Sequence, residues 1–278
     1  MFGSHMKSRE RRTIEQLRRH YKVEKQIANK LRRSTRAQRI QIMRTMYDEL
    51  FAQVPDHPRL TARDAPKRAE ILVARQMQLL ARYLQPNHTF LEFGPGNCNL
   101  AIVVCSMVSR VYAVDISDTL DPSTEKPSNF NFLVYDGFDL DLPDESIHVV
   151  YSDQMVEHLH PDDTADHFRL VHRLLKPNGI YVFRTPHRLY GPHDISRYFS
   201  DVPECFHLKE WTFAELGKLV ESLGFCRWQG CWCARGMCRR MPKWLLLFSE
   251  RVISLWPLKI RRRIGPYLLP SITMVVKK

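Results

Sequence analysis

The sequence predicts an α/β protein with a doubly wound, mostly parallel sheet. Short apolar runs alternate with longer helix-permissive segments along residues 88–276, which is the pattern of βαβ units. The first run, Thr89–Leu91, is followed by Glu92 and then by the turn Gly94-Pro95-Gly96. Glycines there allow a sharp bend and let a ligand approach backbone amides. We therefore expect a ligand crevice at the carboxyl ends of the strands.

Three helices are expected before the first strand. Residues 7–33 are basic and contain neither Pro nor Gly. Thr35 and Gln38 have the spacing of a capping box, so a second helix should begin there and run to about Gln53. A third helix is expected over about residues 64–84.

Six further strands are predicted after the glycine turn, which gives seven in all. They are expected at residues 110–115, 131–135, 147–152, 180–184, 225–233 and 271–276. Helices are expected between them at about 100–109, 162–175 and 212–224. Asp115 follows Gly96 by 19 residues, the place where a doubly wound sheet positions a carboxylate that binds ribose hydroxyls.

The net charge of +12 is concentrated at the two ends of the chain. Residues 6–45 hold 14 Lys and Arg against 3 acids, and residues 235–278 hold 11 against 1. Basic arms of this kind suit nucleic acid, an anionic membrane surface or an acidic substrate, and solvated helix faces are the simpler alternative.

Seven cysteines and the lack of a secretory signal pattern predict a reducing, cytoplasmic setting. Four of them, Cys226, Cys231, Cys233 and Cys238, form a cluster whose spacing is not a familiar zinc arrangement. No metal site is therefore expected.

The glycine turn is not that of a dinucleotide site, because Asn99 stands where the third glycine would be. Five motifs nevertheless occur in order, four at the carboxyl ends of predicted strands and one just before the fifth predicted strand. They are Glu92 to Cys98 (EFGPGNC), Asp115, Asp136-Gly137, Asp153-Gln154 and the turn at residues 174–179 (LLKPNG). In these motifs residues 88–278 resemble the class I S-adenosylmethionine-dependent methyltransferases, of the methyltransferase type 11 kind.

The resemblance implies a Rossmann-like methyltransferase fold with an antiparallel pair of final strands and S-adenosyl-L-methionine as cofactor. It places Glu92 near the donor's amino group, Asp115 on the ribose, Asp136 on the adenine amine and Phe138 on the adenine face. The implied cofactor site comprises Glu92, Gly94, Pro95, Gly96, Asn97, Asp115, Ile116, Asp136, Gly137, Phe138, Asp153 and Gln154. Cys98 is expected to be buried and inert.

Polar side chains after the fourth and fifth strands are expected to face the donor methyl group. The predicted catalytic residues are His158, His187, His193 and Arg197. The predicted acceptor-binding residues are Tyr47, Arg188, Tyr190 and Tyr198. A carboxylate acceptor needs no base, whereas a hydroxyl gains from a positioned histidine, and both remain open. An ion pair between Asp194 and Arg197 that only rigidifies the loop is an alternative.

The chain is expected to have three parts, of which the resemblance implies the last. Residues 1–5 are interpreted as an expression-tag remnant, residues 6–87 as a basic helical lid, and residues 88–278 as the methyltransferase domain. Within that domain, residues 235–270 form a basic, amphipathic insertion, of which 242–264 could contact a membrane surface peripherally.

The predicted function is O-methylation of a hydroxyl or carboxylate on a small or lipid-like metabolite, and the arginines near the site would suit an anionic one. Oxygen is favoured because the fourth-strand motif is not Asn-Pro-Pro-Tyr, the family signature for nitrogen acceptors. An RNA methyltransferase that uses the basic arms is one alternative. A non-catalytic module that binds S-adenosylmethionine or a membrane is the other.

Overall fold

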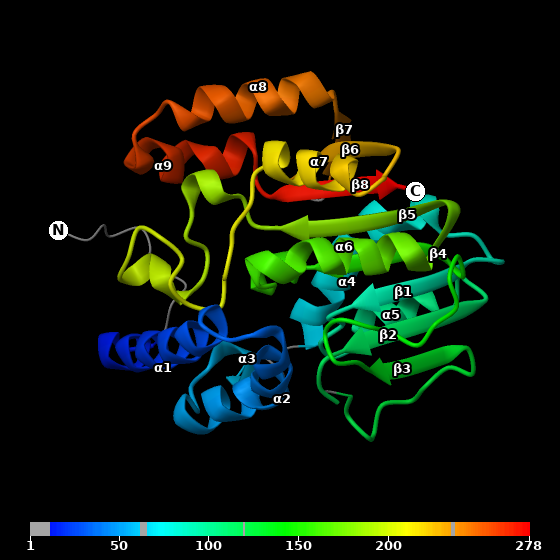
Figure 1. Cartoon of the computed structure of the whole chain (residues 1–278), viewed down its shortest axis with the longest axis horizontal. Coiled ribbons are helices and arrows are strands. Elements are labelled where there is room, and N and C mark those ends of the chain that lie inside the picture. The colour runs from blue at the N-terminus through cyan, green and yellow to red at the C-terminus, as the bar shows by residue number, and fades with distance from the viewer. Residues whose placement is uncertain (1–11, 62–65, 119, 235–236) are drawn as a thin grey trace.

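An eight-stranded sheet forms the centre of the molecule, in the order β3-β2-β1-β4-β5-β8-β6-β7 (Figure 1). The computed structural model describes residues 12–61, 66–118, 120–234 and 237–278. Strands β3, β2, β1, β4 and β5 run parallel to one another, and β8 is antiparallel to both β5 and β6. The predicted doubly wound, mostly parallel sheet is therefore confirmed.

The elements follow the predicted order closely. The strands are β1 (Thr89–Phe93), β2 (Arg110–Asp115), β3 (Phe130–Val134), β4 (Ile147–Asp153), β5 (Leu175–Thr185), β6 (Arg227–Ala234), β7 (Met237–Met241) and β8 (Ile272–Lys277). The longer helices are α1 (Ile14–Arg32), α2 (Arg36–Gln53), α4 (Pro66–Leu80), α6 (Pro161–Leu174), α7 (Phe213–Ser222), α8 (Lys243–Ser254) and α9 (Leu258–Leu268). The short helical elements are α3 (Pro58–Thr61), α5 (Asn99–Val104), η1 (Ala81–Tyr83), η2 (Val156–His158), η3 (Arg188–Tyr190) and η4 (Ile195–Tyr198).

Helices cover both faces of the sheet, and each face has its own apolar core. On one face, Phe168 of α6 and Leu216 of α7 pack against Phe183 of β5. On the other, Leu80 of α4 and Leu100 of α5 pack in the second core. Because both faces are buried, the central strands are nearly continuous apolar runs, as parallel sheets require.

The eighth strand, β7, corrects the predicted count of seven. Residues 237–241 were expected to belong to the insertion, but they pair antiparallel with β6 and extend the sheet. Cys233 and Cys238 face each other across this hairpin and form a disulfide. The expectation of reduced cysteines therefore does not hold for these two residues.

Helices α1, α2 and α3 lie at the carboxyl ends of the parallel strands (Figure 1), whereas α4 covers a face of the sheet. The predicted capping box is present, because Gln38 N–H donates to Thr35 Oγ1 and Thr35 N–H donates to Gln38 Oε1. A second capping box at Thr13, which the sequence analysis did not propose, begins α1. Apolar residues of α1 and α2 such as Ile27 and Leu50 form a third core.

Ion pairs attach this helical layer to the body of the protein. Arg39 Nε and Nη2 contact the two carboxylate oxygens of Asp163 at 2.6 and 2.5 Å. Both residues are buried, with 5% and 9% of their surface exposed. Asp163 lies in the first turn of α6. More exposed pairs join Arg36 to Asp166 and Lys25 to Glu204, so several charges of the basic arm serve packing.

The insertion folds into α8 and α9, which lie at the far end of the sheet from β3 (Figure 1). Leu246 and Ile253 of α8 are buried, whereas Trp244, Phe248 and Leu255 are exposed. Exposed Lys and Arg residues accompany the apolar ones. Across the described ranges, no helix is both long and apolar enough to cross a bilayer. The predicted peripheral membrane contact stays a prediction.

Replacing Arg39 by Met should lower the free energy of unfolding by about 3–5 kcal/mol, because the Asp163 carboxylate would remain buried without its partner. Arg36→Met is the matched control, since its ion pair is exposed and should contribute only about 0–1 kcal/mol. Urea unfolding followed by circular dichroism measures both. Adding Asp163→Asn to Arg39→Met should recover part of the lost stability. Equal losses of stability in Arg39→Met and Arg36→Met would contradict the assignment.

Candidate functional site

The turn after β1 has the backbone that the sequence predicted. Gly94 and Gly96 have φ angles of 65° and 56°, a region that favours glycine. Cys98 also has a positive φ, of 57°, and precedes α5. Its side chain is fully buried, and burial raises the pKa of the Cys98 thiol to about 12. The prediction that Cys98 is buried is confirmed, and its lack of reactivity stays a prediction that the raised pKa supports.

Glu92 provides a buried acceptor without a hydrogen-bond partner. Only 4% of the residue is exposed, and its Oε2 atom accepts no hydrogen bond in the described part of the chain. Burial, with a smaller contribution from Asp153, raises the pKa of Glu92 to about 8. A cationic amine placed against this carboxylate would supply both a hydrogen bond and a charge. The site thus fits the amino end of S-adenosylmethionine.

The next two strand ends carry the other predicted cofactor residues. Asp115 Oδ1 accepts the Ile116 amide at 2.7 Å, and burial raises the Asp115 pKa despite that bond and the positive charge of Arg59. Asp136 Oδ1 accepts the amides of Phe138 and Asp139 at 2.8 and 2.9 Å. These bonds hold the carboxylates at the strand ends, where ligands of doubly wound sheets bind.

The helical layer contacts this part of the site. The sulfur-bound methyl of Met43 lies 2.8 Å from where a Cβ on Gly137 would be, so only glycine fits there without a shift. The Arg36 guanidinium lies 4.1 Å from the centroid of the Phe138 ring. One face of Phe138 is therefore already in contact with a cation. The assignment of the ring to adenine stays a prediction.

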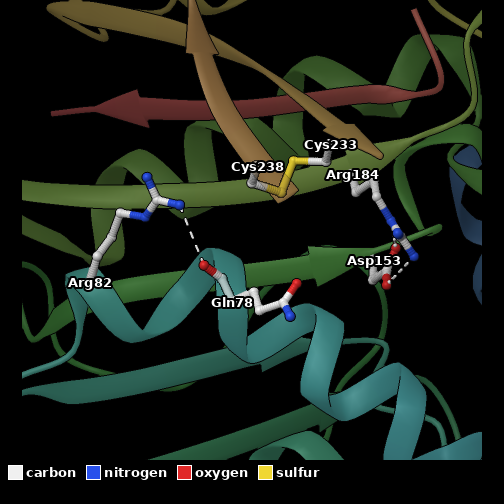
Figure 2. The surroundings of a disulfide bond; sticks show 6 residues. All are labelled: Gln78, Arg82, Asp153, Arg184, Cys233 and Cys238. Atoms are coloured by element: carbon white, nitrogen blue, oxygen red, sulfur yellow. Dashed lines mark hydrogen bonds and ion pairs between the residues drawn. A yellow bond between two sulfur atoms is a disulfide. The ribbon is translucent and has the colours of Figure 1, made fainter. Parts of the chain in front are cut away.

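Asp153 was predicted to bind the cofactor, but the structure uses its carboxylate to join β4 to β5. Arg184 Nε and Nη2 contact its two oxygens at 2.7 and 2.8 Å (Figure 2). Gln76 of α4 donates to the second oxygen at 3.0 Å. Its neighbour Gln154 has a φ of 56° and donates its amide to the Arg184 carbonyl. Asp153 is therefore assigned a structural role.

A cavity of about 290 Å³ lies between the helical layer and the loops that follow β4 and β5. It contains five of the predicted acceptor-side residues together with several that were not predicted. The lining residues are Arg12, His20, Glu24, Tyr47, Leu50, His57, Pro58, Arg59, His158, His193, Asp194, Ile195, Arg197, Tyr198, Phe206 and His207. This volume is close to the lower end of the range for small-molecule sites.

Glu210 organises the imidazoles on one side of this cavity. Its Oε1 accepts the His193 amide and lies 2.8 Å from His207 Nδ1, and its Oε2 lies 3.1 Å from His193 Nδ1. Burial alone would raise the Glu210 pKa, but the bonds from both histidines lower it to about 2. Because Glu210 accepts a hydrogen bond from His193 Nδ1, the proton of the neutral ring stays on Nδ1. Nε2 of His193 is then free to accept a proton.

Three predicted site residues do not line the cavity. His187 is fully buried, and its Nε2 atom lies 2.8 Å from Glu250 of α8. The Tyr190 hydroxyl donates to the carbonyls of Leu269 and Pro270. Arg188 is paired with Glu215 at 2.8 Å. These side chains attach the loop to α7, α8 and the segment after α9, which explains why polar groups are concentrated there.

The predicted alternative for Asp194 and Arg197 is not what the structure shows. Asp194 Oδ1 accepts the Ser196 amide and Oδ2 accepts the His207 amide. Arg197 donates to the hydroxyl of Tyr198. Asp194 thus shapes the loop, and the Arg197 side chain stays at the cavity.

The cavity residues of α1 and α3 were not predicted from the sequence. Glu24 is buried, accepts the Phe206 amide through Oε1 and pairs with His20 through Oε2. Arg59 lies over the Tyr47 ring at 4.8 Å, and its charge acts on both Asp115 and His158. One signal was available for Glu24, since it is the only acid between Gln16 and Tyr47 in a basic segment.

Comparison with known proteins agrees with this geometry. Residues 91–183 match a family model described as a methyltransferase domain. A probable S-adenosylmethionine-dependent methyltransferase of Mycolicibacterium smegmatis is 37% identical over 138 residues, which cover 49% of this chain and 51% of the relative. One of Mycobacterium tuberculosis is 29% identical over 157 residues, 54% of each chain. The chain thus spans about half the length of the curated relatives it matches.

Solved structures of low sequence identity share the fold. An Archaeoglobus fulgidus S-adenosylmethionine-dependent methyltransferase has a TM-score of 0.51 at 18% identity and covers 76% of this chain and 94% of its own. A Haemonchus contortus phosphoethanolamine N-methyltransferase has a TM-score of 0.55 at 13% identity, covering 88% and 50%. The resemblance predicted from the sequence, to a class I methyltransferase domain with a Rossmann-like fold, is confirmed.

Glu92→Gln should stabilise the protein in the absence of donor, increasingly so as the pH rises. The pKa of Glu92 is raised from 4.5 to about 8 in the folded chain. Between these values the folded state holds a proton that the unfolded state has lost, so stability falls as pH rises. Glutamine does not titrate, so its contribution to stability does not change with pH. The free energy of unfolding of Glu92→Gln should therefore exceed that of the parent protein by a margin that grows by up to about 1.4 kcal/mol per pH unit and levels off above pH ~8.

Thermal unfolding at several pH values measures this difference. Glu125→Gln, which replaces an exposed acid, is the control and should show no such trend. A pH-independent difference between Glu92→Gln and the parent protein would contradict the assignment.

Proposed function

We propose that this chain, whose fold is that of the class I S-adenosylmethionine-dependent methyltransferases, methylates an oxygen atom of a small or lipid-like acceptor. The single observation that supports this most is the continuity between two sites. Helix α2 reaches both sites, because Met43 packs against Gly137 at the predicted adenine position and Tyr47 lines the polar cavity. A donor held at the strand ends would therefore lie beside an acceptor in the cavity.

The chain's own residues bind and orient the donor. Glu92 faces the amino group, Asp115 accepts from the ribose hydroxyls, and the Gly94–Gly96 turn lets the backbone approach. S-adenosylmethionine, when bound, supplies a methyl group on a sulfonium that is already activated for displacement. The protein's main contribution is then positioning, which can lower a barrier by about 7–11 kcal/mol.

His193 is the residue best placed to take a proton from a hydroxyl acceptor. It lines the cavity, and Glu210 contacts its Nδ1 atom at 3.1 Å. Glu210 thereby fixes the ring orientation and would stabilise the imidazolium that forms. A carboxylate acceptor would not need the His193 base. The effect of removing His193 therefore distinguishes a hydroxyl acceptor from a carboxylate acceptor.

Cationic side chains make the cavity suitable for an acceptor that carries negative charge. Arg59, Arg197 and Arg12 all line it. Guanidinium groups bind carboxylate or phosphate oxygens through paired hydrogen bonds. The small volume and the ion pairs that engage the basic arm favour a small acceptor over RNA, for which an extended cationic surface is needed.

Asp115→Ala should raise the dissociation constant for S-adenosylmethionine by at least about tenfold, because each hydrogen bond to a charged group contributes about 1.5–3 kcal/mol. Isothermal titration calorimetry measures the affinity. Asp118→Ala is the matched control, since Asp118 is an exposed acid three residues further on. An unchanged affinity in Asp115→Ala would remove the cofactor assignment.

His193→Ala should lower the turnover of a hydroxyl acceptor by about 10²–10⁴-fold while leaving donor affinity unchanged. Transfer of a labelled methyl group to components of a metabolite extract identifies the acceptor and gives the rate. His172→Ala, on α6 outside the cavity, is the control. Full activity of His193→Ala on a hydroxyl acceptor would exclude this residue as the base.

A further inference from the structure

Two imidazoles on one side of the acceptor cavity lie close to a buried carboxylate. Glu157, His158 and His207 each offer a ligand atom within 4.8 Å of those of the other two. Glu157 and His158 belong to η2, directly after β4, and His207 lies in the loop before α7. Residues 49 positions apart in the sequence are thus brought together by the fold.

The free oxygen of Glu157 has no hydrogen-bond partner. The residue is fully buried, and its Oε2 atom accepts from the Thr185 hydroxyl at 2.8 Å. Its Oε1 atom is buried and accepts no hydrogen bond from any described residue. A buried carboxylate oxygen left in this condition is costly. A cation would satisfy it.

Both imidazoles are oriented through Nδ1. His158 Nδ1 lies 3.0 Å from the Phe206 carbonyl, and His207 Nδ1 lies 2.8 Å from Glu210 Oε1. Metal-binding histidines are commonly held in this way, with one ring nitrogen donating to a carbonyl or carboxylate and the other left for the metal. All three side chains therefore have an orienting partner outside the cluster.

Two other groups of possible ligands in the described residues are less suitable. In the group of His20, Glu24 and His57, His20 and Glu24 are already paired with each other at 2.5 Å. In the group of Glu24, Asp194 and Cys205, both Asp194 oxygens accept backbone amides. Among these three groups of described residues, only Glu157, His158 and His207 combine an unsatisfied carboxylate oxygen with two imidazoles that are both held through Nδ1.

We infer that Glu157, His158 and His207 bind a divalent transition-metal cation at the wall of the acceptor cavity. Two imidazoles and one carboxylate are the ligand set that zinc, iron(II) and manganese(II) accept in proteins, with further positions left open. Because His158 and His207 line the cavity, those positions face it. An oxygen of the acceptor can occupy one of them, a consequence that rests on the proposed function.

Cobalt(II) is the probe, because its visible absorption reports coordination by protein ligands without any activity measurement. The full chain, treated with a chelator and dialysed, is titrated with cobalt(II) and then with zinc(II) as competitor. One equivalent should bind with ligand-field bands that zinc removes. The absence of a stoichiometric, zinc-sensitive spectrum would overturn the proposal.

The variants assign the ligands. Loss of a residue that only orients a metal ligand weakens metal affinity by about 10–100-fold. Glu157→Gln and His207→Gln remove proposed ligands, so each should weaken cobalt affinity by more than this. His57→Asn, in the neighbouring cluster, should leave it unchanged. Loss in His57→Asn, or equal affinity in all variants, would overturn the assignment.

Folding and donor binding are measured separately. Circular dichroism shows whether each variant folds. If His207→Gln does not fold, Glu157→Gln alone tests the metal site, because the glutamine oxygen can still accept the hydrogen bond from Thr185. Calorimetry with S-adenosylmethionine on the metal-free protein tests the proposed function independently. Donor binding without cobalt binding refutes the metal site alone, and cobalt binding without donor binding refutes only the transferase.

Discussion

The cavity of this protein depends on the buried ion pair between Arg39 and Asp163. This pair attaches α2 to the first turn of α6, and so holds the helical layer over the carboxyl ends of the strands. Tyr47 of α2 and Arg59 of α3 line the same cavity as His158 and the loop after β5. A bidentate guanidinium–carboxylate contact suits this task because it fixes orientation as well as distance.

Buried carboxylates then determine the chemistry of the enclosed space. Glu24, Glu157 and Glu210 are each buried, and each contacts a backbone amide, a hydroxyl or an imidazole. Such groups are costly to bury unless they are paired, so every one constrains its neighbours. The result is a set of histidines with fixed ring orientation beside arginines that can receive an anionic oxygen.

The order of the elements and the donor side of the site could be predicted from the sequence, because both depend on local patterns. Gly94, Glu92 and Asp115 lie at strand ends, and strand ends of a parallel sheet meet at one edge wherever the helices are placed. His187, Tyr190 and Asp153 follow the same pattern yet serve the scaffold. Their partners Glu250, Leu269 and Arg184 lie far away in the sequence, or on a neighbouring strand.

By itself, the sequence determined the doubly wound sheet, the glycine turn and the capped helix at Thr35, since each follows from periodicity or from contacts over a few residues. Tertiary structure alone decided which polar side chains meet. The antiparallel pairing of β7 with β6 and the cluster of Glu157, His158 and His207 arise from packing between distant segments. Local propensity carries no information about such pairings, because the energy of a buried polar contact depends on what surrounds both partners.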